Sequence, residues 1–143
     1  MNRSIHLLLL SIVCYNLGFS QNRDSSARIT KETFRYDLNV EIEAGFPGGE
    51  LAWNKYLEKN INVNIPEQKG AKKGEYKITI DFSIDKMGST TNLKANTNFG
   101  FGMEDELIRV IKNSPRWSPG IQKGKPLDVN RRQSFTFIIS GED

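Results

Sequence analysis

Strict alternation of apolar and polar residues marks three segments of the chain. The clearest is residues 76–84, where Tyr, Ile and Phe at every second position are separated by polar residues. The same period of two occurs over residues 34–44 and 131–140. Because this period is typical of a strand that buries one face, each segment is predicted to be a strand. Residues 89–95 alternate more weakly after a turn at 85–88, which predicts a hairpin with the first segment.

Two other segments carry apolar residues at helical spacing, as expected for helices packed on a core. The first is residues 50–60, which carry Trp53, Tyr56 and Leu57 on one stripe that continues to Ile61. The second is residues 103–113, whose stripe is Met103, Leu107, Val110 and Ile111. The predicted order is therefore β-α-β-β-α-β. The predicted fold class is α+β, with two helices packed on a small, mostly antiparallel sheet.

Residues 1–20 have the pattern of a secretory signal peptide. Arg3 precedes an apolar run, and small residues lead to a cleavage site before Gln21. The apolar run is shorter than the roughly twenty residues of a spanning helix, and no transmembrane span is expected in the mature chain. An uncleaved anchor and a lipoprotein acylated at Cys14 are the alternatives for this segment.

The chain beyond the leader is long enough for one domain with a hydrophobic core. Residues 21–31 are polar and are predicted to form a flexible lead-in. The domain is predicted to span residues 32–143, with an extra N-terminal strand at 32–45.

The composition narrows the chemistry that the mature chain can perform. The only His and the only Cys of the protein, His6 and Cys14, lie in the leader. Their loss removes disulfides, thiol nucleophiles, histidine bases and Cys/His zinc sites. The formal net charge of +3 is too mild to indicate nucleic-acid binding. The protein is therefore expected not to be an enzyme, to need no cofactor or metal, and not to bind nucleic acid.

The remaining charged clusters have ordinary structural explanations. Asp81 and Asp85 are close in sequence, but Asp85 is expected in a turn and Asp81 on the solvent face, which argues against paired catalytic carboxylates. Lys69, Lys72 and Lys73 form a basic loop. Such a loop is usually only solvated, and contact with acidic partners or headgroups is the alternative.

A set of spaced Pro, Gly and Trp residues lies between the second predicted helix and the last predicted strand. This set resembles the TonB C-terminal-like domain, in the form common among Bacteroidetes-type bacteria. Four other parts of the chain share the resemblance: the Phe-Pro-Gly-Gly-Glu string at 46–50, the turn region 80–88 and the segments 104–112 and 133–139. The resemblance covers residues 46–139. The signature residues of the loop, expected mainly to shape it, are Pro115, Trp117, Pro119, Gly120, Gly124, Lys125 and Pro126.

The resemblance implies a periplasmic module that binds extended peptides by β-strand addition. Its expected partners are TonB-box-like segments of outer-membrane TonB-dependent transporters, which implies a role in energy-coupled transport. Trp117 is expected to pack against the second helix. The candidate partner-binding residues match the receiving strand of the family and the start of that strand. They are Arg131, Arg132, Gln133, Ser134, Phe135, Thr136 and Phe137.

The chain departs from the family in ways that leave a second hypothesis open. The expected form is stand-alone, without an inner-membrane anchor or a Pro-rich spacer. If the terminal strand does not bind a partner segment, it is expected to be an ordinary member of its own sheet or the seam of a homodimer. The strand predicted at 34–44 would either cover a sheet edge or pair with a second copy. The alternative function is therefore a structural or assembly protein of the cell envelope that dimerises through the sheet edge.

Overall fold

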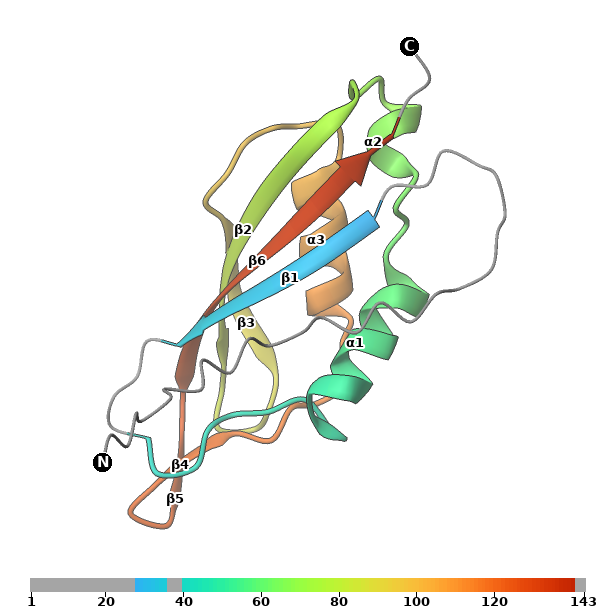
Figure 1. Ribbon diagram of the computed structural model, residues 1–143. Coiled ribbons are helices and arrows are strands. Elements are labelled where there is room, and N and C mark those ends of the chain that lie inside the picture. Colours follow the sequence, from blue (N-terminus) through green and yellow to red (C-terminus); the bar gives the residue numbers. More distant parts are fainter. Residues whose placement is uncertain (1–27, 36–39, 141–143) are drawn as a thin grey trace, which may run out of the picture.

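The computed structural model describes residues 28–35, by their backbone, and residues 40–140. Figure 1 shows two long helices on one side of a twisted sheet. The elements in chain order are β1 (Arg28–Arg35), α1 (Gly49–Asn60), α2 (Ile65–Gln68), β2 (Gly74–Ile84), β3 (Thr90–Ala95), α3 (Met103–Lys112), β4 (Gly120–Gln122), β5 (Lys125–Leu127) and β6 (Val129–Ile139).

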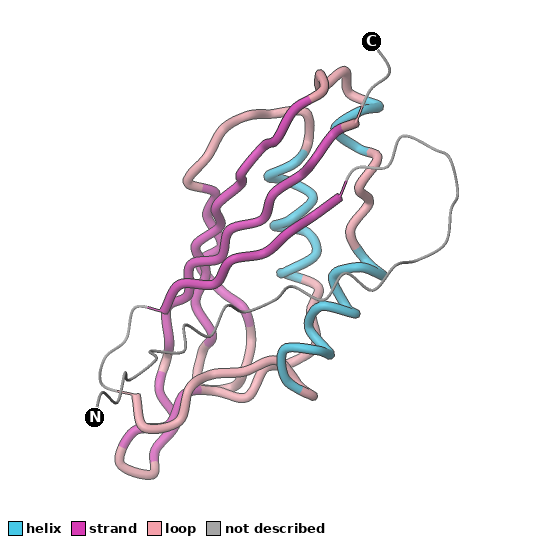
Figure 2. The backbone as a smooth tube through the Cα atoms, viewed as in Figure 1, coloured by secondary structure: helices cyan, strands magenta, loops and turns pink. Residues whose placement is uncertain are grey.

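The main sheet has four strands in the order β1-β6-β2-β3, and every neighbouring pair is antiparallel. β2 and β6 pair along their whole length, with Ile78 opposite Phe135 and Ile80 opposite Gln133. The strands β4 and β5 form a separate hairpin below this sheet (Figure 2). The last strand of the chain therefore lies in the interior of the sheet and not at its edge.

The hydrophobic core lies between the sheet and the helices α1 and α3. Its strand side comes from the alternating apolar residues of β2 and β6, as the period of two predicted. Its helix side comes from the two predicted stripes, which are buried apart from the half-buried Tyr56. The fully buried side chains include Ile78, Ile80, Ile84, Leu107, Val110, Ile111, Phe135 and Phe137.

A polar contact ties the end of α1 to α3. The Glu106 carboxylate accepts hydrogen bonds from the backbone N–H of Asn62 (2.7 Å) and from Arg109 (2.7 and 2.8 Å). Burial alone would raise the pKa of Glu106, but these hydrogen bonds outweigh burial and lower it. Arg109 also donates to the carbonyl of Asn60 (2.8 Å), and the Tyr56 hydroxyl donates to the carbonyl of Val110 (3.0 Å).

The predicted strand at 34–44 is confirmed only at residues 34–35, which end β1, and is wrong over residues 40–44. Residues 40–45 make only two isolated bridges, Ile42 with Ile121 and Gly45 with Ser118. They therefore lie beside the loop after α3 and the strand β4. Ile42 is 60% exposed although the alternation predicted it to face inward.

The predicted order β-α-β-β-α-β is therefore also wrong. From α1 onward the main elements follow the order α-β-β-α-β, with the small hairpin β4–β5 added. The strand that precedes α1 is β1, which overlaps the predicted strand only at residues 32–35 and takes residues 28–31 from the predicted lead-in. The predicted signal peptide at 1–20 and residues 21–27 of the lead-in lie outside the described residues.

Two short elements were not predicted. The helix α2 falls in the expected loop at 65–74 and has Pro66 in its first turn, where proline is favoured. The hairpin β4–β5 falls inside the signature loop. Its turn residues Lys123 and Gly124 have φ of 49° and 69°, as a two-residue hairpin turn requires.

Candidate functional site

The candidate partner-binding residues 131–137 all lie in β6, and their side chains alternate between the two faces of the sheet. Gln133, Phe135 and Phe137 are buried against the helices, whereas Ser134 and Thr136 belong to the opposite face. The Gln133 amide nitrogen has no hydrogen-bond partner among the described residues. The inward side chains therefore serve the core, and a strand added beside β6 would meet mainly its backbone.

Both edges of β6 are paired within the chain. β2 lies on one side, and β1 lies on the other from Arg28 opposite Ile138 to Arg35 opposite Arg131 (Figure 1). The candidate residues 131–137 are therefore covered by a strand of the protein itself. This covering strand is not the one predicted at 34–44, with which β1 shares only residues 34–35.

The strand β1 has the composition of a weakly anchored edge strand. Only Ile29 and Phe34 of its eight residues are large and apolar. The structure shows its pairing with β6, in which each of these eight residues lies opposite a residue of β6.

The other edge of the sheet is β3, which pairs with β2 only on its inner side in the described structure. The pairing of β2 with β3 shifts register between Asp81 and Ser83, and Asn92 adopts a φ of 52°. A bulge and an exposed lysine, Lys94, are features that discourage strand addition. The side of β6 that β1 covers is therefore a better candidate than the outer edge of β3 for pairing with a partner strand.

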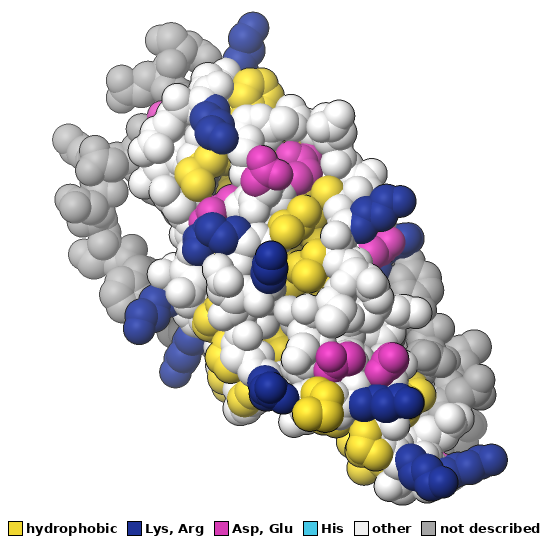
Figure 3. All heavy atoms as spheres, turned by 180° about the vertical axis from the view of Figure 1, so that it is seen from behind, with side chains coloured by type: hydrophobic (Ala, Val, Ile, Leu, Met, Phe, Trp, Pro, Cys, Tyr) yellow, Lys and Arg dark blue, Asp and Glu magenta, His cyan; other side chains and the backbone are white. Residues whose placement is uncertain are grey.

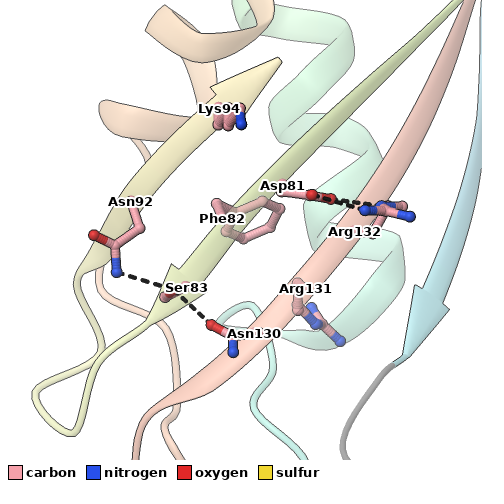
Figure 4. A pocket seen from close by; sticks show the side chains of 8 residues that line it. All are labelled: Asp81, Phe82, Ser83, Asn92, Lys94, Asn130, Arg131 and Arg132. Carbon is pink, nitrogen blue, oxygen red and sulfur yellow. Dashed lines mark hydrogen bonds and ion pairs between the residues drawn. The ribbon is translucent and has the colours of Figure 1, made fainter. Parts of the chain in front are cut away.

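A shallow pocket of about 500 Å³ opens where β3, β2 and β6 run side by side (Figure 4). On its floor Arg132 holds both carboxylate oxygens of Asp81, at 2.6 and 2.9 Å. Next to this pair, the Ser83 hydroxyl donates to the Asn130 side-chain oxygen (2.8 Å) and accepts from Asn92 (3.2 Å). The pocket is lined by Asp81, Phe82, Ser83, Asn92, Lys94, Asn130, Arg131 and Arg132.

The two arginines proposed at the start of the receiving strand have separate roles. Arg132 points to Asp81 on the polar face, whereas the Arg131 guanidinium lies 5.1 Å from the ring centre of Trp117. A hydrogen bond from Arg132, with a further one from Asn96 and the nearby positive charges, lowers the pKa of Asp81 below its ordinary value of 3.8. Asp81 and Arg132 face each other in the β2–β6 register, a pairing that was not predicted from the sequence.

The Asp81–Arg132 pair is expected to make stability depend on pH at the acid end. Because the pKa of Asp81 is lower in the folded state, the unfolded chain binds more protons between the two values. The pair therefore stabilises the fold above about pH 4 and loses this effect as pH falls through the folded-state value. We expect Asp81→Asn to cost no more than about 1 kcal/mol at neutral pH, since both side chains are partly exposed.

The measurement is urea unfolding of both proteins between pH 2 and pH 7, a range set by the ordinary carboxyl titration of roughly 3.8 to 4.3. The difference between wild type and Asp81→Asn should be constant near neutrality and shrink toward the acid end. Glu58→Gln, a change at an exposed carboxylate of α1, is the control and should leave the acid slope almost unchanged. If the free energies of unfolding of the wild type and Asp81→Asn differ by the same amount at every pH, Asp81 is not a source of the acid dependence.

The signature loop is mainly a structural feature. Trp117 is 3% exposed, and its ring contacts Phe46, Trp53 and Phe82 at centroid distances of 5.1 to 5.8 Å. Its ring neighbours include Trp53 of the first long helix, α1. Trp117 N–H also donates to the carbonyl of Gly88 (2.7 Å), which fastens the loop to the β2–β3 turn. Of the remaining signature residues, Gly120 is buried, Pro119 is half-buried, and Pro115, Gly124, Lys125 and Pro126 are exposed.

Asp85 is committed to the β2–β3 turn. Its carboxylate accepts the N–H groups of Met87 (2.9 Å) and Ser89 (2.8 Å). Among the described residues, no group of three or more His, Cys, Asp or Glu side chains is placed to hold a metal ion. The same residues include no helix that is long and apolar enough to cross a membrane.

No family model, no curated protein and no solved structure matches the chain significantly.

Proposed function

We propose that the chain is an exported, periplasmic peptide-binding module of the TonB C-terminal-like kind. Its partner is an extended, TonB-box-like segment of an outer-membrane TonB-dependent transporter, and its binding serves energy-coupled transport. The proposal is supported by the motifs between residues 46 and 139 and by an antiparallel sheet with both long helices on one face. The observation that carries it is the edge of β6, which already holds one short, polar strand.

The partner segment would take the place of β1 beside β6. Strand addition draws its affinity from main-chain hydrogen bonds, which any extended segment can offer. β1 makes eight antiparallel residue pairs with β6 and carries only two large apolar residues, so what it offers β6 is mainly main-chain pairing. Because β1 is part of the same chain, it competes with the partner at a high effective concentration. The apparent affinity for the partner is therefore reduced in proportion to the fraction of molecules in which this side of β6 is free.

Two adjacent prolines in β1 test this arrangement. Residues along an antiparallel strand alternate in facing the neighbour with their N–H groups, so Lys31→Pro with Glu32→Pro must remove one donor to β6. We expect the double variant to bind a TonB-box-like peptide about tenfold more tightly than the wild type. The measurement is titration of the labelled peptide into the full chain, followed by backbone amide shifts.

The control is Lys31→Gln with Glu32→Gln, which changes the same side chains and keeps both backbone donors. It should bind the peptide like the wild type. Shifts along residues 133–139 are expected in each protein that binds. Shifts confined to β3 would mean that the partner uses the other edge, and a proline variant that binds more weakly than its control would contradict displacement of β1.

The same edge gives the second candidate function, an envelope assembly protein that dimerises through its sheet. If β1 of one copy pairs with β6 of another, the two copies exchange identical strands, which is a common route to dimers. A solution mass measurement over a wide concentration range separates the two functions. A strict monomer excludes assembly by strand exchange, and a stable dimer that ignores the peptide excludes the transporter partner.

A further inference from the structure

The loop between β3 and α3 presents two aromatic rings at the surface. Phe99 is 45% exposed and Phe101 is 38% exposed. Both rings meet Tyr76 of β2 edge-on, at centroid distances of 5.6 and 6.4 Å. We call the three residues the aromatic triad. This group lies outside the core and has no role in the proposed strand pairing.

The loop has an unfavourable backbone conformation that a buried carboxylate holds in place. Gly100, Phe101 and Gly102 have φ of 79°, 52° and 75°, three left-handed residues in succession. This conformation is unfavourable for phenylalanine and persists only where the surroundings hold it. The Glu104 carboxylate, 9% exposed, accepts the N–H groups of Phe99 (2.8 Å) and Gly100 (3.2 Å). The rings are thus presented by a constrained loop.

Two residues of the basic loop contact the aromatic triad or the loop that carries it. The Lys69 ammonium packs against Gly102, and the Tyr76 hydroxyl donates to the carbonyl of Lys72 (2.8 Å). Lys69, Lys72 and their neighbour Lys73 are all exposed. Figure 3, which shows the helix side of the molecule, has hydrophobic side chains at the surface in small groups beside both basic and acidic side chains. The basic loop singled out in the sequence is therefore part of the same surface as the triad.

We propose that this end of the molecule docks on a bilayer surface that carries anionic headgroups. Aromatic rings favour the boundary between headgroups and acyl chains, and lysines extend to the phosphates beside them. Each lysine near an anionic surface adds a weak, independent attraction. A small set of rings and lysines suits this additive kind of binding better than a protein interface, which needs a large complementary surface. Among the exposed residues of segments 65–73 and 99–105, Lys69, Lys72 and Lys73 outnumber the acids Glu67 and Asp105. The buried Glu104 carboxylate is hydrogen-bonded within the loop.

The test is co-sedimentation of the full chain with vesicles of phosphatidylcholine alone or mixed with phosphatidylglycerol. The wild type should bind the anionic vesicles, and salt should weaken the binding. Phe99→Ser with Phe101→Asn should bind at least about fivefold more weakly, since asparagine tolerates a left-handed backbone. Lys69→Gln with Lys72→Gln should reduce the preference for anionic over neutral vesicles to a similar extent.

Leu51→Ser is the matched control, because Leu51 is 78% exposed on α1 and lies in no aromatic cluster of the described structure. It should bind vesicles like the wild type, and it carries the same residues 1–20 as the other variants. Equal losses in the control and the Phe variant, or no loss in the Phe variant, would overturn the proposal. If the chain ignores every vesicle and binds polyglutamate through the same lysines, the partner is an acidic protein and the lipid assignment is wrong.

Discussion

Replacing Gly88 with alanine is expected to destabilise the fold by at least about 3 kcal/mol. Gly88 lies in the β2–β3 turn with a φ of +83°, a conformation that alanine adopts at a cost of about 1–2 kcal/mol. An added Cβ would also overlap the backbone carbonyl oxygen of Trp117. Because the overlap is with backbone, no side-chain rotation relieves it. Either the turn or the signature loop must move, and the hydrogen bond from Trp117 N–H to the Gly88 carbonyl is then lost.

Gly124→Ala is the control for the backbone term. Gly124 has a φ of +69°, close to that of Gly88, but a Cβ there would meet nothing within 4 Å. It should cost only about 1 kcal/mol. Both free energies come from urea unfolding followed by tryptophan fluorescence. If the two variants lose the same stability, the close approach of the turn to the Trp117 loop is not a constraint on the fold.

The core was predictable because it depends on short-range periodicity. The alternation in residues 76–84 and the stripe of residues 103–113 each identified both the element and its buried face, including Ile78, Ile80 and Leu107. These patterns are local, and each needs one partner surface to make it stable. The coarse architecture, two helices on a small antiparallel sheet, followed from pairing those surfaces.

The N-terminal strand was not predictable from its pattern. Residues 34–44 alternate well, yet residues 40–45 lie along the β4–β5 hairpin, and the much more polar β1 pairs with β6. Alternation indicates that a segment has one apolar and one polar face, but it does not indicate which strand the segment pairs with. The chain between Ala44 and α1 is bridged to Ser118 and turns at Pro47 and Gly48, which keeps this segment near the signature loop.

The candidate site was predicted only in part for a related reason. The sequence identified the strand, but whether its edge is free depends on a long-range pairing that no local pattern encodes. The same holds for Asp81 and Arg132, which meet only because the β2–β6 register places them opposite each other. The aromatic triad was missed because Phe99 and Phe101 lie in a loop with no periodicity, where only the Gly-Phe-Gly run of residues 100–102 signalled an unusual backbone.

Replacing Trp117 with alanine is the other change with a large expected effect, a loss of about 3–5 kcal/mol. The ring fills the space between Phe46, Trp53 and Phe82, and its Nε1 donates to the Ser114 hydroxyl (3.0 Å). Alanine would leave a cavity between α1 and the sheet and remove the support of the Arg131 guanidinium. In a domain of this size the melting temperature should fall by roughly 10–30 °C.

Trp117→Phe separates packing from the polar contacts. Phenylalanine keeps an aromatic ring against Trp53 but loses the hydrogen bond to Ser114 and part of the surface under Arg131, so it should cost about 1–2 kcal/mol. Thermal unfolding followed by far-ultraviolet circular dichroism avoids the change in fluorescence. If Trp117 is a structural residue, thermal stability should decrease in the order wild type, Trp117→Phe, Trp117→Ala. Had Trp117 been held out for a partner, both variants would keep the stability of the wild type and lose only peptide binding.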